Sequence, residues 1–145
     1  MHRMIVAAWL LGIATFAHGA DIGQVKVVKG HVTIERVSQS LPATAGMHVE
    51  ASDVVRTGAD GSVGITMTDN SLLSAGPDSV LALDRYEFDD VTSAGRFDAS
   101  LRQGTLAVVS GRLAKQSRDA MKVHTPSAIL GVRGTEFVVR VGNAP

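Results

Sequence analysis

Short runs of alternating residues are the feature of this sequence that most restricts its fold. After the first 20 residues, apolar side chains recur at every second position in runs of five to eight residues, and each run ends at Gly, Pro, Asp, Asn or Ser. Residues 63–67, "VGITM", show the pattern clearly. A period of two places the apolar side chains on one face of a β-strand. The pattern therefore predicts a single all-β domain over residues 21–145. This length is ordinary for one domain.

A nine-residue interval recurs in the middle of the chain. Two sets of residues keep this spacing: Asp60, Asp69 and Asp78, and Val63, Leu72 and Leu81. About five residues of strand and four of turn fill such an interval, and strands of this length either stack as solenoid rungs or pair as a meander. We therefore predict a compact two-sheet β-sandwich or β-roll with short, stacked, solenoid-like strands. An antiparallel meander sandwich is the alternative.

Three segments predict particular elements. Lys29 and Gly30 separate two alternating runs and predict a first hairpin. Residues 101–113, "LRQGTLAVVSGRL", are apolar on both faces and predict a strand at the centre of the core. Residues 86–96 are the most polar stretch and predict a solvated loop. The residues that predict structural turns are Gly58, Gly61, Gly76, Pro77, Pro126, Gly131 and Gly134.

The first 20 residues have the order of a secretory signal peptide. Arg3 gives a short basic start, residues 5–16 are almost wholly apolar, and small residues precede Asp21. The cleavage site falls after Gly19 or Ala20. The apolar run is shorter than the roughly 20 residues that a membrane-spanning helix needs. We therefore predict removal of residues 1–20, no transmembrane span after cleavage, and a periplasmic or secreted location.

Composition narrows the classes of partner and chemistry. The chain holds 14 basic and 14 acidic residues and no cysteine. Among the acidic and basic residues, loss of the leader removes only Arg3. No basic patch dominates the mature chain, so we predict no nucleic-acid partner. The lack of cysteine excludes disulfides, a thiol nucleophile and thiolate metal sites.

Residues 123–139, "VHTPSAILGVRGTEFVV", are the strongest candidate for a catalytic segment. A nucleophile would be Thr125 or Ser127, activated by His124. Because neighbouring strand residues point to opposite faces, His124 and Thr125 cannot act on one bond. A Gly-x-Ser-x-Gly elbow is also missing from the sequence. We therefore predict that the protein is not an enzyme.

Metal and cofactor sites are not predicted either. The histidines at 31 and 48 lie in separate predicted strands without metal-ligand spacing. The turns around Asp60, Asp69 and Asp78 lack the paired glycines of calcium-binding nonapeptides, and Asp in a turn usually accepts backbone hydrogen bonds. Arg133 lies between two glycines, and we interpret it as an internal anchor to Glu136, Asp53 or another carboxylate rather than as an anion site.

Several motifs together resemble the FecR domain family. They are the "DVVRTG" strand end, the "DNS" turn, the "GPDS" turn, "LRQGTLAVV" and the ending "TPSAILGVRGTEF". The resemblance runs roughly from Val25 to Val141. Small departures are Asn70, where the family usually has glycine, and "GMHVEASD" at residues 46–53. The resemblance to the family implies an exported all-β module. The family's namesake is an inner-membrane sigma-factor regulator whose periplasmic FecR domain receives a signal from an outer-membrane transporter.

The resemblance implies a sensing or docking module. Only four residues precede the apolar run, so we expect no cytoplasmic sigma-factor segment. We expect docking to an envelope protein through a strand edge or loops. The predicted contact residues are Arg56, Asp60, Asp69, Asp78 and Arg133. The alternatives are a glycan-binding envelope protein, which the small number of aromatic residues argues against, and a regulator in a sigma-factor or transporter system that lacks its cytoplasmic segment.

Overall fold

The protein is nearly all-β. A computed structural model describes residues 21–117, 119–133 and 136–142, and within these ranges it has twelve strands and one short helix. The elements are β1 (Asp21–Lys29), β2 (Val32–Arg36), β3 (Gln39–Pro42), β4 (His48–Glu50), β5 (Val54–Thr57), β6 (Ser62–Met67), β7 (Leu72–Ala75), β8 (Val80–Phe88), β9 (Gly95–Val109), α1 (Arg112–Gln116), β10 (Met121–His124), β11 (Ile129–Gly131) and β12 (Glu136–Val141). The all-β prediction is confirmed. The predicted signal peptide at residues 1–20 lies outside the described residues.

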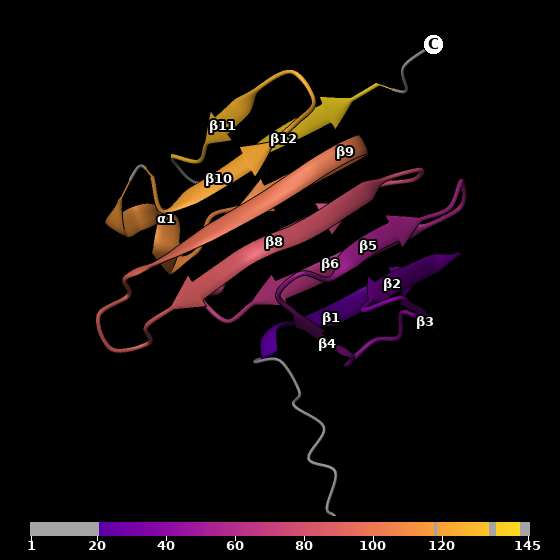
Figure 1. The fold of residues 1–145 in the computed structure, drawn as a ribbon, viewed down its shortest axis with the longest axis horizontal. Coiled ribbons are helices and arrows are strands. Elements are labelled where there is room, and N and C mark those ends of the chain that lie inside the picture. The colour runs from indigo at the N-terminus through magenta and orange to yellow at the C-terminus, as the bar shows by residue number, and fades with distance from the viewer. Residues whose placement is uncertain (1–20, 118, 134–135, 143–145) are drawn as a thin grey trace, which may run out of the picture.

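The strands form one curled sheet that is organised around β9. The first part of β9 pairs with β8 on one side and with β10 on the other, whereas its last residues pair with β7 and β12. From β9, one run of strands continues through β8, β5, β2 and β3, which we call the β8 run. The other continues through β7, β6, β1 and β4, which we call the β7 run. Figure 1 shows the two runs overlying one another, so the predicted two sheets are joined into one through β9.

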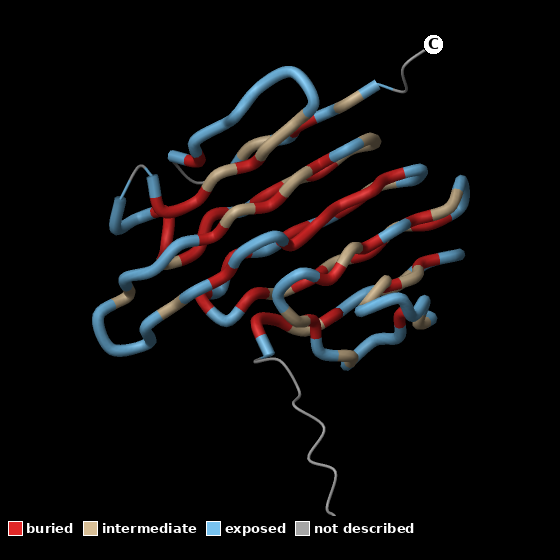
Figure 2. Tube along the Cα trace, viewed as in Figure 1, coloured by how far each residue is buried: buried red, intermediate tan, exposed pale blue. Residues whose placement is uncertain are grey.

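Both runs contribute side chains to a single hydrophobic core. Ile34 and Leu81 from the β8 run are completely buried, and so are Leu106 and Val108 from β9. Figure 2 shows buried and exposed residues alternating along the strands. Each such side chain contributes about 1.5–3 kcal/mol by leaving water. The predicted central strand at 101–113 is confirmed over residues 101–109 of β9, whereas Arg112 and Leu113 belong to α1. The second face of β9 is open, since Val109 is 38% exposed.

The nine-residue interval reflects short strands joined by short turns, of which only β6–β7 is a hairpin. β6 and β7 form a hairpin in which Val63 lies opposite Ala75. All the strand pairs are antiparallel except β9 with β10, among the described residues. Solenoid rungs would need parallel pairing between successive repeats. The interval therefore reflects one hairpin turn, β6–β7, and two turns, β5–β6 and β7–β8, at which the chain crosses between the runs, so the solenoid-like part of the prediction is wrong.

The predicted first hairpin is also wrong. β1 pairs with β4 and β6, whereas β2 pairs with β3 and β5, so the chain crosses from one run to the other at Gly30. Gly30 has φ +62°, and a Cβ there would overlap the carbonyl oxygen of Asp60. A second crossing, from β5 to β6, packs beside it, because the amide of Gly58 donates to the carbonyl of His31 at 2.8 Å. Two neighbouring crossings thus take the place of a hairpin.

Most of the predicted turn residues lie in turns. Gly58 and Gly61 flank the β5–β6 turn, Gly76 and Pro77 lie at the β7–β8 turn, and Pro126 lies between β10 and β11. Two predictions differ in outcome. Gly131 is the last residue of β11 and lies opposite Lys122 of β10, so it is a strand residue. Gly134 lies outside the described residues.

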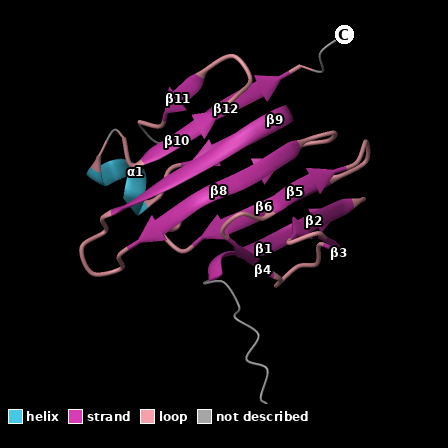
Figure 3. Ribbon diagram, in the orientation of Figure 1, coloured by secondary structure: helices cyan, strands magenta, loops and turns pink. Residues whose placement is uncertain are grey.

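The polar stretch at 86–96 is shorter as a loop than the sequence predicts. β8 continues to Phe88 and β9 begins at Gly95, so only residues 89–94 connect the two strands as a loop (Figure 3). Tyr86 is only 9% exposed, and its ring meets the Phe97 ring edge-on at a centroid distance of 5.2 Å. Burial of these rings draws both ends of the stretch into the sheet.

Candidate docking site at the open seam

One end of the curled sheet is covered by its own loop. The two runs end at β3 and β4, and residues 43–47 connect these strands. The amide of Ala43 donates to the carbonyl of Val32 at 2.9 Å, and the amide of Val25 donates to the carbonyl of Met47 at 2.8 Å. This loop therefore forms backbone hydrogen bonds with both runs and holds their ends together.

The opposite end is open. The β10–β11 hairpin continues the sheet beside the first part of β9, and β12 continues it beside the last part. Among the described strands, β11 pairs only with β10 and β12 only with β9. A cleft of about 570 Å³ lies between the hairpin and β12, and we call it the seam cleft. Its lining residues are Arg102, Gln103, Thr125, Pro126, Ser127, Leu130, Val139, Arg140, Val141 and Gly142.

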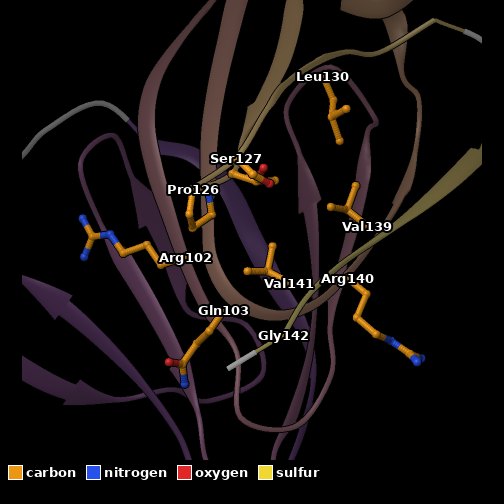
Figure 4. A pocket seen from close by; sticks show the side chains of 10 residues that line it. Arg102, Gln103, Pro126, Ser127, Leu130, Val139, Arg140, Val141 and Gly142 are labelled. Atoms are coloured by element: carbon orange, nitrogen blue, oxygen red, sulfur yellow. The ribbon is translucent and has the colours of Figure 1, made fainter. Parts of the chain in front are cut away.

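The seam cleft is largely apolar at its centre and carries charge at its margins. Figure 4 shows Pro126, Leu130 and Val141 around the opening, whereas the side chains of Arg102 and Arg140 point away from it. Unpaired strand edges beside exposed apolar side chains are common places for another chain to add. The cleft therefore presents an apolar centre, and the side chains of Arg102 and Arg140 at its margins turn outward.

The candidate catalytic segment offers hydrogen bonds to itself rather than to a reacting group. The hydroxyl of Thr125 accepts from the amide of Ala128 at 3.0 Å and donates to its carbonyl at 3.1 Å. The Nε2 atom of His124 lies 3.6 Å from Asp98 Oδ1. Ser127 is exposed beside them. The geometry is that of a stabilised hairpin turn.

The remaining described histidines are paired separately. His31 Nδ1 lies 3.4 Å from a carboxylate oxygen of Asp60, and His48 Nδ1 lies 3.5 Å from one of Asp21. In the part of the chain that the structure describes, no three His, Cys, Asp or Glu residues gather in a group that could hold a metal ion.

The five predicted contact residues do not form one surface. The turns that carry Asp60 and Asp78 adjoin each other, because the amide of Asp78 donates to the carbonyl of Gly58 at 3.0 Å. Arg56 is nearby and forms an exposed ion pair with Glu35. Backbone hydrogen bonding from His31 lowers the pKa of Asp60. Asp69 lies at the other end of β6, so it is separated from these turns.

Asp69 is an internal residue, which corrects its prediction as a contact residue. Its exposed fraction is 0%. One carboxylate oxygen accepts from the amide of Ser71 at 3.0 Å, and the other accepts from the hydroxyl of Ser71 at 2.7 Å and the amide of Leu113 at 3.1 Å. Asp69 therefore fastens the β6–β7 turn to the first turn of α1. A nine-residue spacing in the sequence does not distinguish this aspartate from the two exposed ones.

Arg36 holds the role that the sequence suggested for Arg133. Arg133 is exposed and forms no ion pair with a described residue. Asp53, at 1% exposure, instead accepts two bonds from Arg36, at 2.9 Å from Nε and 2.7 Å from Nη2. The hydrogen bond to Asp53 is the main cause that raises the pKa of Arg36. This pairing joins distant elements and has no local signal in the sequence.

Tyr86 provides a spectroscopic test of the buried Asp69 cluster. Its hydroxyl accepts from the hydroxyl of Thr68 at 2.8 Å and from the amide of Asp69 at 2.9 Å. Burial raises the pKa of Tyr86 to about 12. Because the chain has one tyrosine, the phenolate absorbance reports this residue alone. We expect a titration midpoint near pH 12 in the folded protein, and near about 10 in denaturant.

The same shift predicts an alkaline loss of stability. A raised folded-state pKa means that the stabilisation is fully present below about pH 10 and is lost as the pH rises to about 12. The loss should reach about 2–3 kcal/mol, and Tyr86→Phe should remove this part of the pH profile. A folded-state midpoint near that of the denatured chain would contradict the buried geometry.

The described aromatic side chains offer no exposed platform for a sugar ring. Phe97 is completely buried and Tyr86 nearly so, while Phe88 and Phe137 are partly buried against the core. Arg112 also covers Phe88, with its guanidinium carbon 5.0 Å from the ring centroid. Aromatic stacking therefore gives no support to the glycan-binding alternative.

The fold and the seam define an all-β domain whose curled sheet is covered at one end and open at the other. The family model described as FecR protein matches residues 53–145, which is more than half of the chain. The chain therefore belongs to the FecR family, and the resemblance that its motifs predict is confirmed over this range. Neither the curated proteins nor the solved structures yield a match. No helix in the described ranges is long and apolar enough to cross a membrane.

Proposed function

We propose that this FecR domain is a non-catalytic module of the cell envelope that docks an extended segment of another envelope protein in the seam cleft. The observation that carries the proposal is the open seam itself, where an apolar cleft adjoins the hydrogen-bonding edges of β11 and β12. Membership of the FecR family supports a role in sensing or signalling. The leader-like residues 1–20 support export to the periplasm or beyond the cell.

The cleft also suggests the chemistry of the docked segment. Leu130, which lines the cleft, is 36% exposed, and Pro126 of the same lining is exposed too. Apolar side chains from a partner would cover these residues, and carboxylates near its ends would approach Arg102 and Arg140. A single extended segment meets both demands, because alternate side chains of a strand face opposite sides.

Site-specific photo-crosslinking in the native cell envelope tests this proposal. A crosslinking side chain at Leu130 should give a discrete adduct with one protein, because this position lines the cleft. The matched control is Val91, which is 91% exposed in the β8–β9 loop and does not line the cleft. The Leu130 adduct should fall at least about tenfold when Val141→Asp places an unpaired charge in the apolar centre, as expected for burial of an unpaired charge.

Two outcomes would contradict docking in the cleft. Identical adducts from positions 130 and 91 would indicate random collision. Turnover of a substrate by the purified protein, lost on substitution of His124, would instead favour catalysis at the same segment.

A further inference from the structure

We propose that β12 is also a self-association edge, which pairs antiparallel with β12 of a second copy around a two-fold axis at Val138. This contact would extend the sheet from β12 of one copy into β12 of the next. It goes beyond docking in the seam cleft, because its occupant is a second copy of this chain, although Val139, Arg140 and Val141 of β12 also line the cleft.

The backbone of β12 is available along one whole side. All six of its residues pair with β9, from Glu136 opposite Val109 to Val141 opposite Gly104. No other described strand pairs with β12. Figure 1 shows β12 at the margin of the sheet. A six-residue edge is a typical strand length, and its unpaired amides and carbonyls can bond to another strand.

The charges on β12 are complementary to themselves. Directly opposed residues of two antiparallel strands share a face, so a two-fold axis places one residue opposite its own copy. The register centred on Val138 places Glu136 of one copy opposite Arg140 of the other, twice. Shifting the centre to either neighbouring residue loses both pairs. Opposite charges at directly opposed positions stabilise a strand pair, and like charges destabilise it.

Among the described residues, these two charges have no ion-pair partner in their own copy. Glu136 lies opposite Val109, and Arg140 lies opposite Thr105. Both are exposed, and neither joins an ion pair with a described residue. A second copy supplies the missing partner for each one in the register centred on Val138.

The outer face of the sheet, from β1 through β6, β7 and β9 to β12, supports the same register. A row of small and apolar residues crosses five strands in register: Val27, Gly64, Ser74, Ala107 and Val138. Val27 is 52% exposed at one end of this row, and Val138 is 63% exposed at the other. Pairing at Val138 would place the Val138 side chains of the two copies in contact and continue the uncharged row across the dimer. On the inner face it would place partly buried Phe137 opposite Val139 of the second copy.

A charge-exchange experiment tests the register directly. We expect the purified protein to dimerise reversibly in analytical ultracentrifugation. Glu136→Arg and Arg140→Glu should each weaken self-association at least about tenfold, because each places like charges opposite one another. Mixing the two variants should restore dimers, because each copy then faces a partner of opposite charge at both positions. The control, Glu87→Arg, alters an exposed strand residue of the β8 run and should leave dimerisation unchanged.

The circular-dichroism spectra of the single variants should match that of the parent protein, so that loss of folding is distinguished from loss of pairing. A protein that stays monomeric up to its solubility limit would overturn the proposal. Dimers that persist in Glu136→Arg, or a mixture that fails to restore them, would place the contact elsewhere. Arg140 also borders the seam cleft, whereas Glu136 does not, so Glu136→Arg tests self-association separately from docking, and crosslinking from Leu130 reports docking.

Discussion

Replacing Asp69 with alanine is expected to lower the free energy of unfolding by about 3–5 kcal/mol, the range for removing one partner of a buried polar network. The truncation leaves the amide of Leu113 and the amide and hydroxyl of Ser71 without their acceptor at a buried site. Each unsatisfied buried group costs about 1–3 kcal/mol. Such a loss is a large part of the roughly 5–15 kcal/mol that stabilises a domain.

Urea unfolding followed by circular dichroism measures this effect. Asp78→Asn is the matched control, because Asp78 has the same place in the nine-residue interval but is exposed, with φ +51° that asparagine also tolerates. It should change stability little. If Asp69→Ala and Asp78→Asn have equal effects, the hydrogen bonds of Asp69 do not stabilise the fold as the geometry indicates.

The second large effect is expected at Gly104, where β9 changes neighbours. Gly104 has φ +94°, and a Cβ there would overlap Ser79 Oγ and lie 2.5 Å from Ser79 Cα. The left-handed backbone costs a residue with a Cβ about 1–2 kcal/mol. Overlap with backbone atoms forces the strands apart, as overpacking does at about 1–3 kcal/mol. We expect Gly104→Ala to destabilise the protein by about 2–5 kcal/mol in total.

Gly46 allows the two causes to be separated. It has φ +92°, but a Cβ there would meet nothing within 4 Å. Gly46→Ala should therefore show the backbone cost alone, and its difference from Gly104→Ala in urea unfolding reports the clash with Ser79. Equal losses in the free energy of unfolding at the two glycines would mean that the backbone around Ser79 and Gly104 accommodates the added Cβ without cost.

Part of the candidate site could be predicted from local patterns. The segment at 123–139 stands out in the sequence as a candidate catalytic segment, and part of it lines the seam cleft, but none of the five predicted contact residues does. The contact residues are predicted less well, because exposure of a polar residue is a property of the folded chain. Asp60 and Asp69 occupy similar turns in the sequence, yet the first meets solvent and the second meets Leu113, 44 residues away.

Local sequence patterns are sufficient to establish the class of fold. Alternation sets which side chains face the core, and Gly, Pro and Asp set where strands stop, because both are properties of a few consecutive residues. These local rules correctly predict an all-β chain with β9 at its centre. They hold whichever strands become neighbours.

The pairing of strands and of charges depends instead on the whole folded chain. β1 and β2 resemble a hairpin in the sequence, but they lie in different runs, since β1 pairs with β4 and β6 and β2 pairs with β3 and β5. Arg36 pairs with Asp53, and the last residues of β9 pair with β12. No periodic pattern in the sequence connects these partners. Which strands pair depends on the total apolar surface that the whole core buries. That total is set only when the sheet has curled.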